Sequence, residues 1–168
     1  IVDYHGGIMI PAHIFTPHKS FYGRAFKTYS EIFSPAEWEM IPAIELGLSA
    51  DTNMADLMPE LSDKTFLSNS DAHSLPKIAR EYNIMELEGL NFNSVFKALK
   101  RKSGRIKKNY GLNPELGKYH RSHCENCDST FEVEKAVLKC PKCGSDKVIV
   151  GVKDRILEIA ENKAPEHP

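Results

Sequence analysis

The segment Thr65-Phe-Leu-Ser-Asn-Ser-Asp-Ala-His-Ser74 passes from a short apolar stretch into a run of polar residues. Ala43-Ile-Glu-Leu-Gly-Leu48 and Gly7-Ile-Met-Ile-Pro-Ala-His13 are similar stretches, with polar residues at or just beyond their ends. Each predicts a short buried strand, and the helical patterns between them favour an α/β architecture with parallel strands. Because ligands gather where parallel strands end, we expect the functional side chains at these ends.

The remaining segments follow the same alternation. Helices are predicted over 28–38, 52–60, 76–82 and 93–101, and a further strand over 84–88. Asp51 or Thr52 can cap the second of these helices and Ser74 the third. Residues 105–123 carry turn signals and predict an irregular connection, whereas 152–161 predicts an amphipathic helix.

The composition excludes a membrane-spanning protein. Of 168 residues, 41% are hydrophobic and 27% charged, and no apolar stretch approaches the length of a membrane span, which is roughly 18 residues. The first residue, Ile1, and the polar residues that follow it resemble no secretory signal. We therefore expect a soluble, cytoplasmic protein and a sequence that is a fragment of a longer chain.

Charge is distributed unevenly along the chain. Residues 1–96 hold 6 basic and 13 acidic side chains, a net charge of −7, whereas 97–168 hold 16 and 10, a net charge of +6. The second part opens with a basic run that no acidic residue interrupts: Lys97, Lys100, Arg101, Lys102, Arg105, Lys107 and Lys108. Such a run can neutralise the phosphates of a nucleic acid. The alternative is a solvated helix end, where cations are also favourable.

All four cysteines occur in two pairs, Cys124-Glu-Asn-Cys127 and Cys140-Pro-Lys-Cys143, with twelve residues between them. This spacing predicts a zinc ribbon in which four thiolates hold one structural Zn²⁺. Gly144 supplies a residue that tolerates a positive φ after the second pair, and Asp128 holds the equivalent place after the first. A redox pair or free thiols are the alternatives.

Two strand ends carry groups that can bind a catalytic metal. His13 ends one apolar stretch, and Asp71 and His73 lie two residues apart beyond another. In an extended segment, residues at that spacing point to the same side and can hold one cation or two neighbouring cations. Glu45 either lines the same strand-end pocket or pairs with a nearby cation.

Four segments resemble the later motifs of the polymerase and histidinol phosphatase family, and in particular the branch that includes endonuclease Q. They are Ile10-Pro-Ala-His-Ile-Phe-Thr-Pro17, Ala43-Ile-Glu-Leu-Gly-Leu-Ser-Ala-Asp-Thr52, Phe66-Leu-Ser-Asn-Ser-Asp-Ala-His-Ser74 and Lys77-Ile-Ala-Arg-Glu-Tyr82. The resemblance implies a distorted (β/α)7 barrel. It divides the chain into the C-terminal portion of a catalytic domain at 1–110, a linker at 111–123, the zinc ribbon at 124–150, and the start of a C-terminal helical region at 151–168.

The resemblance also implies an activity. His13 matches the late single histidine of the family, and Asp71 and His73 match its final Asp-x-His motif, so all three are expected to bind catalytic Zn²⁺, Mn²⁺ or Mg²⁺. The expected reaction is hydrolysis of a DNA phosphodiester on the 5′ side of a deaminated base or an abasic site. The opening His-x-His motif of the family is absent from this sequence. We therefore expect this chain by itself to be inactive.

Two other functions are consistent with the sequence. One is a phosphoesterase that acts on a small phosphate, which would leave the basic run and the zinc ribbon without a role. The other is a zinc-ribbon module that binds nucleic acid but has no catalytic activity. The sequence gives no indication of oligomeric state.

Overall fold

Two short parallel strands lie at the centre of the first half of the chain. A computed structural model describes residues 1–133 and 137–160, and in it β1 (Ala43–Glu45) pairs with β2 (Thr65–Leu67). Ala43 lies opposite Thr65 and Glu45 opposite Leu67. All six residues are buried, as expected for parallel strands covered on both faces. The architecture is a mixed α/β fold, and the barrel stays a prediction.

The strand predicted over residues 7–13 does not form as a regular strand. This segment nevertheless runs beside β1, because the Glu45 amide donates to the Pro11 carbonyl at 3.0 Å and the Ile14 amide donates to the Glu45 carbonyl at 3.0 Å. Pro11 has no amide hydrogen and cannot extend the ladder. The segment therefore follows the sheet without becoming a full member of it.

Four α-helices are present among the described residues: α1 (Pro35–Met40), α2 (Thr52–Ala55), α3 (Phe92–Leu99) and α4 (Val152–Ile159). The Ser34 side chain caps α1, Asp51 caps α2 and Asn91 caps α3 by accepting a backbone hydrogen bond from the first turn. Single turns of 3-10 helix cover Asp3–His5, Tyr29–Glu31, Pro59–Leu61, Leu75–Lys77 and Pro114–Leu116, and Phe21–Ala25 forms a π-turn.

Three helix predictions were too long. The helix predicted over 52–60 forms only as α2, and a separate 3-10 turn at Pro59–Leu61 follows it. The segment 28–38 breaks before Pro35, which starts a new helix because proline cannot donate to the preceding turn. The predicted helix over 76–82 is reduced to the turn Leu75–Lys77. Leu75 and Ile78 are 82% and 62% exposed, so no packed apolar face stabilises a longer helix there.

An antiparallel hairpin follows, in which β3 (Tyr82–Glu86) pairs with β4 (Arg105–Tyr110), and α3 lies between them in the sequence. The prediction that residues 105–123 are irregular was therefore wrong for its first six residues. Arg105–Tyr110 contains few apolar residues, and its own pattern is weak. It becomes a strand through its pairing with β3 and through a hydrogen bond from the Asn109 amide group to the Phe66 carbonyl at 3.0 Å.

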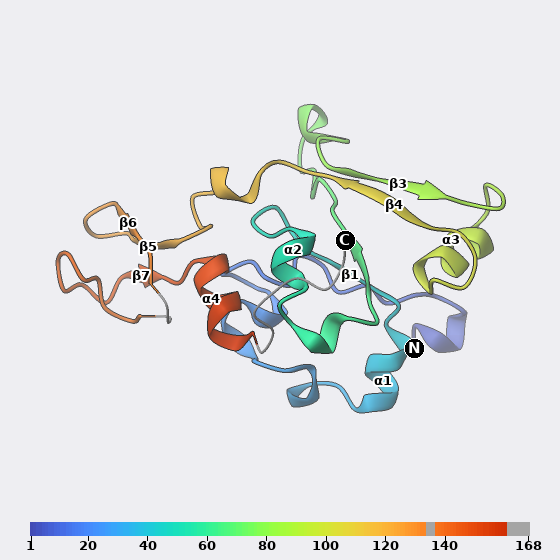
Figure 1. Cartoon of the computed structure of the whole chain (residues 1–168), viewed down its shortest axis with the longest axis horizontal. Helices are drawn as coiled ribbons and strands as arrows, with labels where there is room; N and C mark the ends of the chain where they lie inside the picture. Colours follow the sequence, from blue (N-terminus) through green and yellow to red (C-terminus); the bar gives the residue numbers. More distant parts are fainter. Residues whose placement is uncertain (134–136, 161–168) are drawn as a thin grey trace.

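The cysteine region forms a separate three-stranded antiparallel sheet with the order β6-β5-β7. Its strands are β5 (Ser122–Cys124), β6 (Ser129–Phe131) and β7 (Val148–Ile149). In Figure 1 this sheet lies at one end of the molecule and α3 at the other, with α4 beside the sheet. The helix predicted over 152–161 forms as Val152–Ile159, with Ala160 as its C-cap, and residue 161 lies outside the described residues.

Helix α4 joins the two parts of the molecule. Val152 and Ile156 belong to the same buried cluster as Ile14, Tyr22 and Ile44. The C-terminal helix thus completes the core of the first part instead of lying apart from it. No helix within residues 1–133 and 137–160 is long and apolar enough to cross a membrane.

Candidate functional site

The four cysteine sulfurs lie close together. The Sγ atoms of Cys124 and Cys143 are 3.7 Å apart, as are those of Cys127 and Cys140, and all four lie within 4.8 Å of one another. Zn–S bonds of about 2.3 Å in a tetrahedron place sulfur atoms about 3.8 Å apart. The arrangement therefore fits one tetrahedral Zn²⁺ with no position left for substrate or water.

The local backbone explains how the two pairs reach this geometry. Gly144 has a φ of +73° and Asp128 a φ of +49°, so both turns after the cysteine pairs use the left-handed region as predicted. The Lys142 amide donates to Cys140 Sγ at 3.4 Å. Backbone hydrogen bonding at Ser145 lowers the pKa of Cys143 to about 6, whereas desolvation raises the pKa of Cys124 to about 11.

At the end of β1, the Glu45 carboxylate acts as a hydrogen-bond acceptor for the backbone. It is 5% exposed and accepts the His13 amide at 2.6 Å and the Gly47 amide at 2.8 Å, with the Asn69 amide at 3.4 Å. Because these amides come from three different segments, one carboxylate joins the ends of the strands. No ion pair to Glu45 is present among the described residues, so the alternative of a cation partner is not realised.

Both candidate strand ends have an unusual backbone. His13 has a φ of +36° and Asp71 a φ of +45°, in the left-handed region that non-glycine residues seldom adopt. His13 Nδ1 lies 3.5 Å from the Thr16 hydroxyl. Such conformations cost free energy and are concentrated at functional sites.

Asp71 and His73 lie near each other on the surface. His73 Nδ1 is 2.7 Å from the Asp71 carbonyl and 4.0 Å from Asp71 Oδ1, and the side chains are 81% and 56% exposed for His73 and Asp71 respectively. Among residues 1–133 and 137–160, however, the one group of three or more potential metal ligands in mutual reach is the four-cysteine cluster. The structure thus brings Asp71 and His73 together but does not gather His13 with them. The role of these three residues stays a prediction.

A cavity of about 400 Å³ lies beside the strand ends. Gly47 and Ser68 line it just after β1 and β2, and Asn109 and Gly111 line it at the end of β4. None of His13, Asp71 and His73 is among its lining residues. Polar groups of the strand ends are therefore accessible from a shared hollow, as expected for a site at the carboxyl ends of parallel strands.

The seven residues of the basic run are not equivalent. Lys97 pairs with Glu88 at 3.6 Å, and Arg105 pairs with Glu86 at 3.0 Å. Lys100 Nζ lies 4.2 Å from the centre of the Phe96 ring, and Arg101 donates to the Ser62 and Lys64 carbonyls. Lys102, Lys107 and Lys108 are exposed and have no ion pair with a described residue. The last two lie on β4, so they are the freest cations of the run on a regular element.

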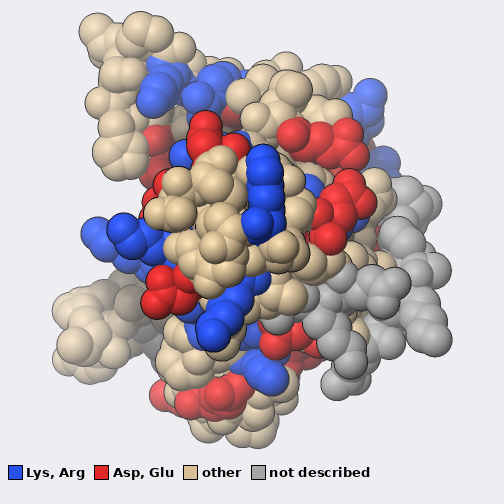
Figure 2. Space-filling model, turned by 90° about the vertical axis from the view of Figure 1, so that its left-hand side faces the viewer, with Lys and Arg blue, Asp and Glu red and all other residues tan. Residues whose placement is uncertain are grey.

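The end of the molecule that holds the four cysteines is not uniformly basic. Figure 2 views this end and shows Lys and Arg side chains interspersed with Asp and Glu. Part of the positive charge is paired, because Arg121 contacts Asp154 at 2.9 Å and Glu132 at 3.8 Å. His123 Nε2 likewise lies 3.2 Å from Asp128.

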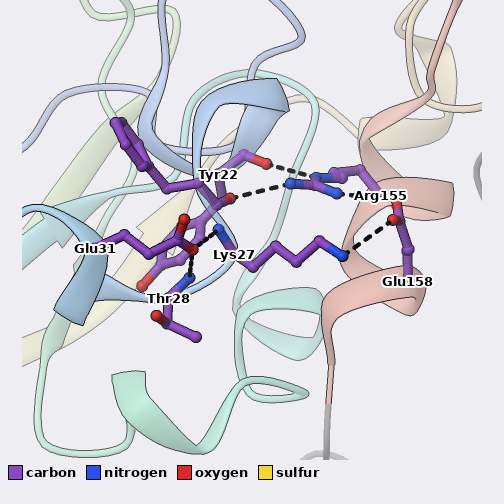
Figure 3. A network of polar contacts seen from close by, with 7 residues as sticks. Tyr22, Lys27, Thr28, Glu31, Arg155 and Glu158 are labelled. Atoms are coloured by element: carbon purple, nitrogen blue, oxygen red, sulfur yellow. Dashed lines mark hydrogen bonds and ion pairs between the residues drawn. The ribbon is translucent and has the colours of Figure 1, made fainter.

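Sequence reasoning missed the polar contacts that hold α4 in place. Arg155 donates to the carbonyls of Tyr22 and Phe26 at 3.0 Å each and to Glu158 at 2.9 Å (Figure 3). Lys27 reaches Glu158 at 4.0 Å (Figure 3). The signal that could have indicated these contacts is the pair of charged residues, Asp154 and Arg155, inside an otherwise apolar helical stripe.

Comparisons with known proteins place the chain among longer ones. It is 47% identical over 159 residues to the uncharacterized protein YqxK of Bacillus subtilis, and 42% identical over 164 residues to the uncharacterized protein MJ0043 of Methanocaldococcus jannaschii. These matches cover 93% and 92% of this chain. The chain spans only 40% and 20% of the two relatives. No protein-family model matches it.

Two solved structures are similar to this one over 95% of the chain. One is the lesion-specific endonuclease PfuEndoQ from Pyrococcus furiosus, with a TM-score of 0.82 and 40% identity. The other is endonuclease Q in complex with a 27-mer duplex substrate that has an abasic lesion at the active site, with a TM-score of 0.81 and 37% identity. This chain covers 40% and 41% of those two proteins.

Proposed function

We propose that this chain is part of a metal-dependent DNA endonuclease of the endonuclease Q type, which hydrolyses a phosphodiester on the 5′ side of a deaminated base or an abasic site. The observation that carries the proposal is the likeness to two solved endonuclease Q structures, at 37–40% identity over 95% of the chain. At that identity the likeness includes side chains as well as the path of the backbone.

In this proposal, residues 1–110 are part of a (β/α)7 barrel in a cytoplasmic protein, residues 111–123 are a linker, and residues 151–168 begin a helical region. His13, Asp71 and His73 hold divalent cations at the strand ends. A cation bound by these residues would supply Lewis-acid chemistry: it would lower the pKa of a water molecule and stabilise charge on the leaving oxygen. The proximity of Asp71 to His73 and the left-handed backbone of His13 and Asp71 support this assignment.

In this proposal the zinc ribbon at 124–150 and the basic run both serve DNA binding, the first by stabilising the fold and the second by contacting phosphates. The closed four-cysteine site contributes folding free energy instead of chemistry. Exposed Lys102, Lys107 and Lys108 provide charges for the DNA backbone. A phosphoesterase for small phosphates would need neither feature.

The test is a cleavage assay with the complete gene product that includes this sequence. The substrates are 5′-labelled duplexes with one abasic site, one uracil or one hypoxanthine, with Mg²⁺, Mn²⁺ or Zn²⁺ added in turn. We expect one cut on the 5′ side of the lesion, and we expect Asp71→Asn and His73→Gln to reduce its rate by about a hundredfold or more. Lys77→Gln, which changes an exposed residue close by in the sequence, is the control.

Cleavage that is unchanged in the Asp71→Asn and His73→Gln variants would show that these residues are not catalytic. Hydrolysis of p-nitrophenyl phosphate without cleavage of any duplex would favour the small-phosphate phosphoesterase. DNA binding without either reaction would favour the non-catalytic zinc-ribbon module.

A further inference from the structure

Two tyrosines are stacked on the exposed side of the β3–β4 hairpin. The rings of Tyr82 and Tyr110 have centroids 4.9 Å apart and an interplanar angle of 9°. They are directly opposite each other in the register, and they are 44% and 39% exposed. By contrast, the stacked rings of Tyr29, Phe33 and Trp38 pack against the buried core.

Strand alternation separates the two faces of the hairpin. Asn83 and Asn109 point toward β2 and its following loop, because Asn83 accepts the Ser68 amide at 2.9 Å and Asn109 donates to the Phe66 carbonyl. The residues on either side of them must point away. Tyr82, Ile84, Lys108 and Tyr110 therefore share the opposite face, with Ile84 opposite Lys108. We call these four residues the tyrosine face.

The surroundings of the tyrosine face are positively charged. A β-bulge between Ile84 and Met85 leaves two consecutive lysines, Lys107 and Lys108, exposed on β4. Neither has an ion pair with a described residue. A separate groove of about 640 Å³ lies on the β2 side of β4, where Phe66 and Asn109 line it. Its basic lining residues are Arg101, Arg105, Lys107 and Lys108, it has no acidic residue, and neither tyrosine lines it.

We propose that the tyrosine face stacks an unpaired base of a DNA strand whose phosphates contact Lys107 and Lys108. Stacking on aromatic rings requires a base with a free face, which an intact duplex does not present. The proposal rests on the proposed function and adds a source of specificity: DNA distorted by a lesion supplies such a base, so the hairpin selects distortion without reading a base edge.

The charge of the surface identifies a nucleic acid as the occupant instead of an extended peptide. Lysines without acidic partners favour a polyanion, and rings with free hydroxyl groups stay hydrated when no ligand is present. Glu86 lies at the far end of the hairpin, where it is paired with Arg105. A polyanion can therefore approach the tyrosine face without meeting an unpaired carboxylate from β3.

The test measures binding of the complete gene product that includes this chain, without added divalent metal, to a labelled duplex with one abasic site and to the intact duplex at several salt concentrations. 2-Aminopurine opposite the abasic site reports stacking through its fluorescence. We expect the double variant Tyr82→Ala/Tyr110→Ala to bind the lesion duplex about tenfold or more weakly. It should also no longer quench the fluorescence of 2-aminopurine. Tyr82→Phe/Tyr110→Phe should retain both, because the rings remain.

Matched variants separate local from general effects. Tyr4→Ala removes a tyrosine that is 87% exposed elsewhere and should change nothing. Lys107→Ala/Lys108→Ala should weaken the binding of both duplexes and reduce its salt dependence. Lys97→Ala/Lys100→Ala should have a smaller effect, because Lys97 of α3 and Lys100 at its C-cap already contact Glu88 and Phe96. Circular dichroism verifies that each variant is folded.

The outcomes distinguish the two proposals. If the unmodified complete protein binds no DNA even at low salt, DNA binding and the tyrosine face both fail. If the chain binds the lesion duplex but the double alanine variant retains the affinity and the quenching, the tyrosine face is wrong and the proposed function stands. The face would then be a packing surface for protein.

Discussion

The Asp154 carboxylate of α4 accepts hydrogen bonds from both the backbone amide and the hydroxyl of Ser122 on β5. Asp154 Oδ2 lies 2.7 Å from the Ser122 amide nitrogen and 2.7 Å from its hydroxyl, and Asp154 is fully buried. The Ser122 hydroxyl in turn accepts the Gly151 amide at 3.1 Å. Since Ser122 lies two residues before Cys124, this contact fixes the four-cysteine region to the helix that completes the core of the first part of the chain.

The first prediction concerns this contact. Asp154→Asn keeps the size of the side chain but removes the charge that faces Arg121. If the amide oxygen keeps the two Ser122 donors, the NH₂ group is placed against Arg121 Nε, where two donors meet. We expect the substitution to lower the free energy of unfolding by about 3 kcal/mol, measured by urea denaturation. Glu132→Gln is the matched control because Glu132 is the other acidic partner of Arg121 but is 82% exposed. Equal effects of the two substitutions would contradict the role given to Asp154.

Metal removal provides the second prediction. Cys127→Ser should abolish binding of the single equivalent of zinc, measured by mass spectrometry of the metal, because three thiolates cannot close the site. Hydrogen exchange should then show loss of protection in β5 while β1 and β2 stay protected. Lys139→Ala, at the exposed residue beside Cys140, should retain the metal. Retention of full zinc by the serine variant would show that the four sulfurs do not form one site.

The sequence was most informative where a single segment contains its own signal. The cysteine spacing, the positive φ values at Asp128 and Gly144, and the cap at Asp51 are local, and each is confirmed by the structure. Arg105–Tyr110 could not be recognised as a strand because its stability comes from β3 and from the Phe66 carbonyl. A pattern read along one segment does not contain that information.

The candidate site shows the same division. His13, Asp71 and His73 could be selected from strand ends and from family motifs, but their distances depend on how separate segments pack. Glu45 illustrates the difficulty, since a carboxylate at the end of a strand predicts a cation or a pocket. In the structure the Glu45 carboxylate instead accepts hydrogen bonds from three backbone amides, which lie 2 to 32 residues away from Glu45 in the sequence.

The third prediction follows from this arrangement. Glu45→Gln replaces one acceptor oxygen by an NH₂ group, which cannot accept the amides of His13 or Gly47. We expect a loss of about 2 kcal/mol in the free energy of unfolding, and shifts of these two amide resonances in NMR spectra. Glu86→Gln, on the exposed face of β3, should cost less than about 1 kcal/mol. Unchanged amide resonances in the Glu45 variant would contradict the proposed hydrogen bonds.

The fourth prediction concerns the pH dependence of stability and is carried by His120. This residue is 7% exposed, and its Nδ1 atom has no hydrogen-bond partner among the described residues. Desolvation lowers the pKa of His120, and the nearby Lys153 and Arg121 lower it further against the opposite influence of Glu115 and Asp154. Asp51 lines the same cavity as His120. The folded state therefore favours the neutral imidazole.

The sign of the effect is fixed by this shift. The unfolded chain binds a proton at His120 at about pH 6.5 and the folded chain only at lower pH, so stability is complete above that value and falls as the pH decreases toward the folded pKa. His120→Gln is neutral throughout and should give a flatter curve between pH 7.5 and 5.5 in urea denaturation. The four cysteines are the same in both proteins, so the difference between the two curves isolates His120. Parallel curves would show that burial of His120 does not penalise its protonation.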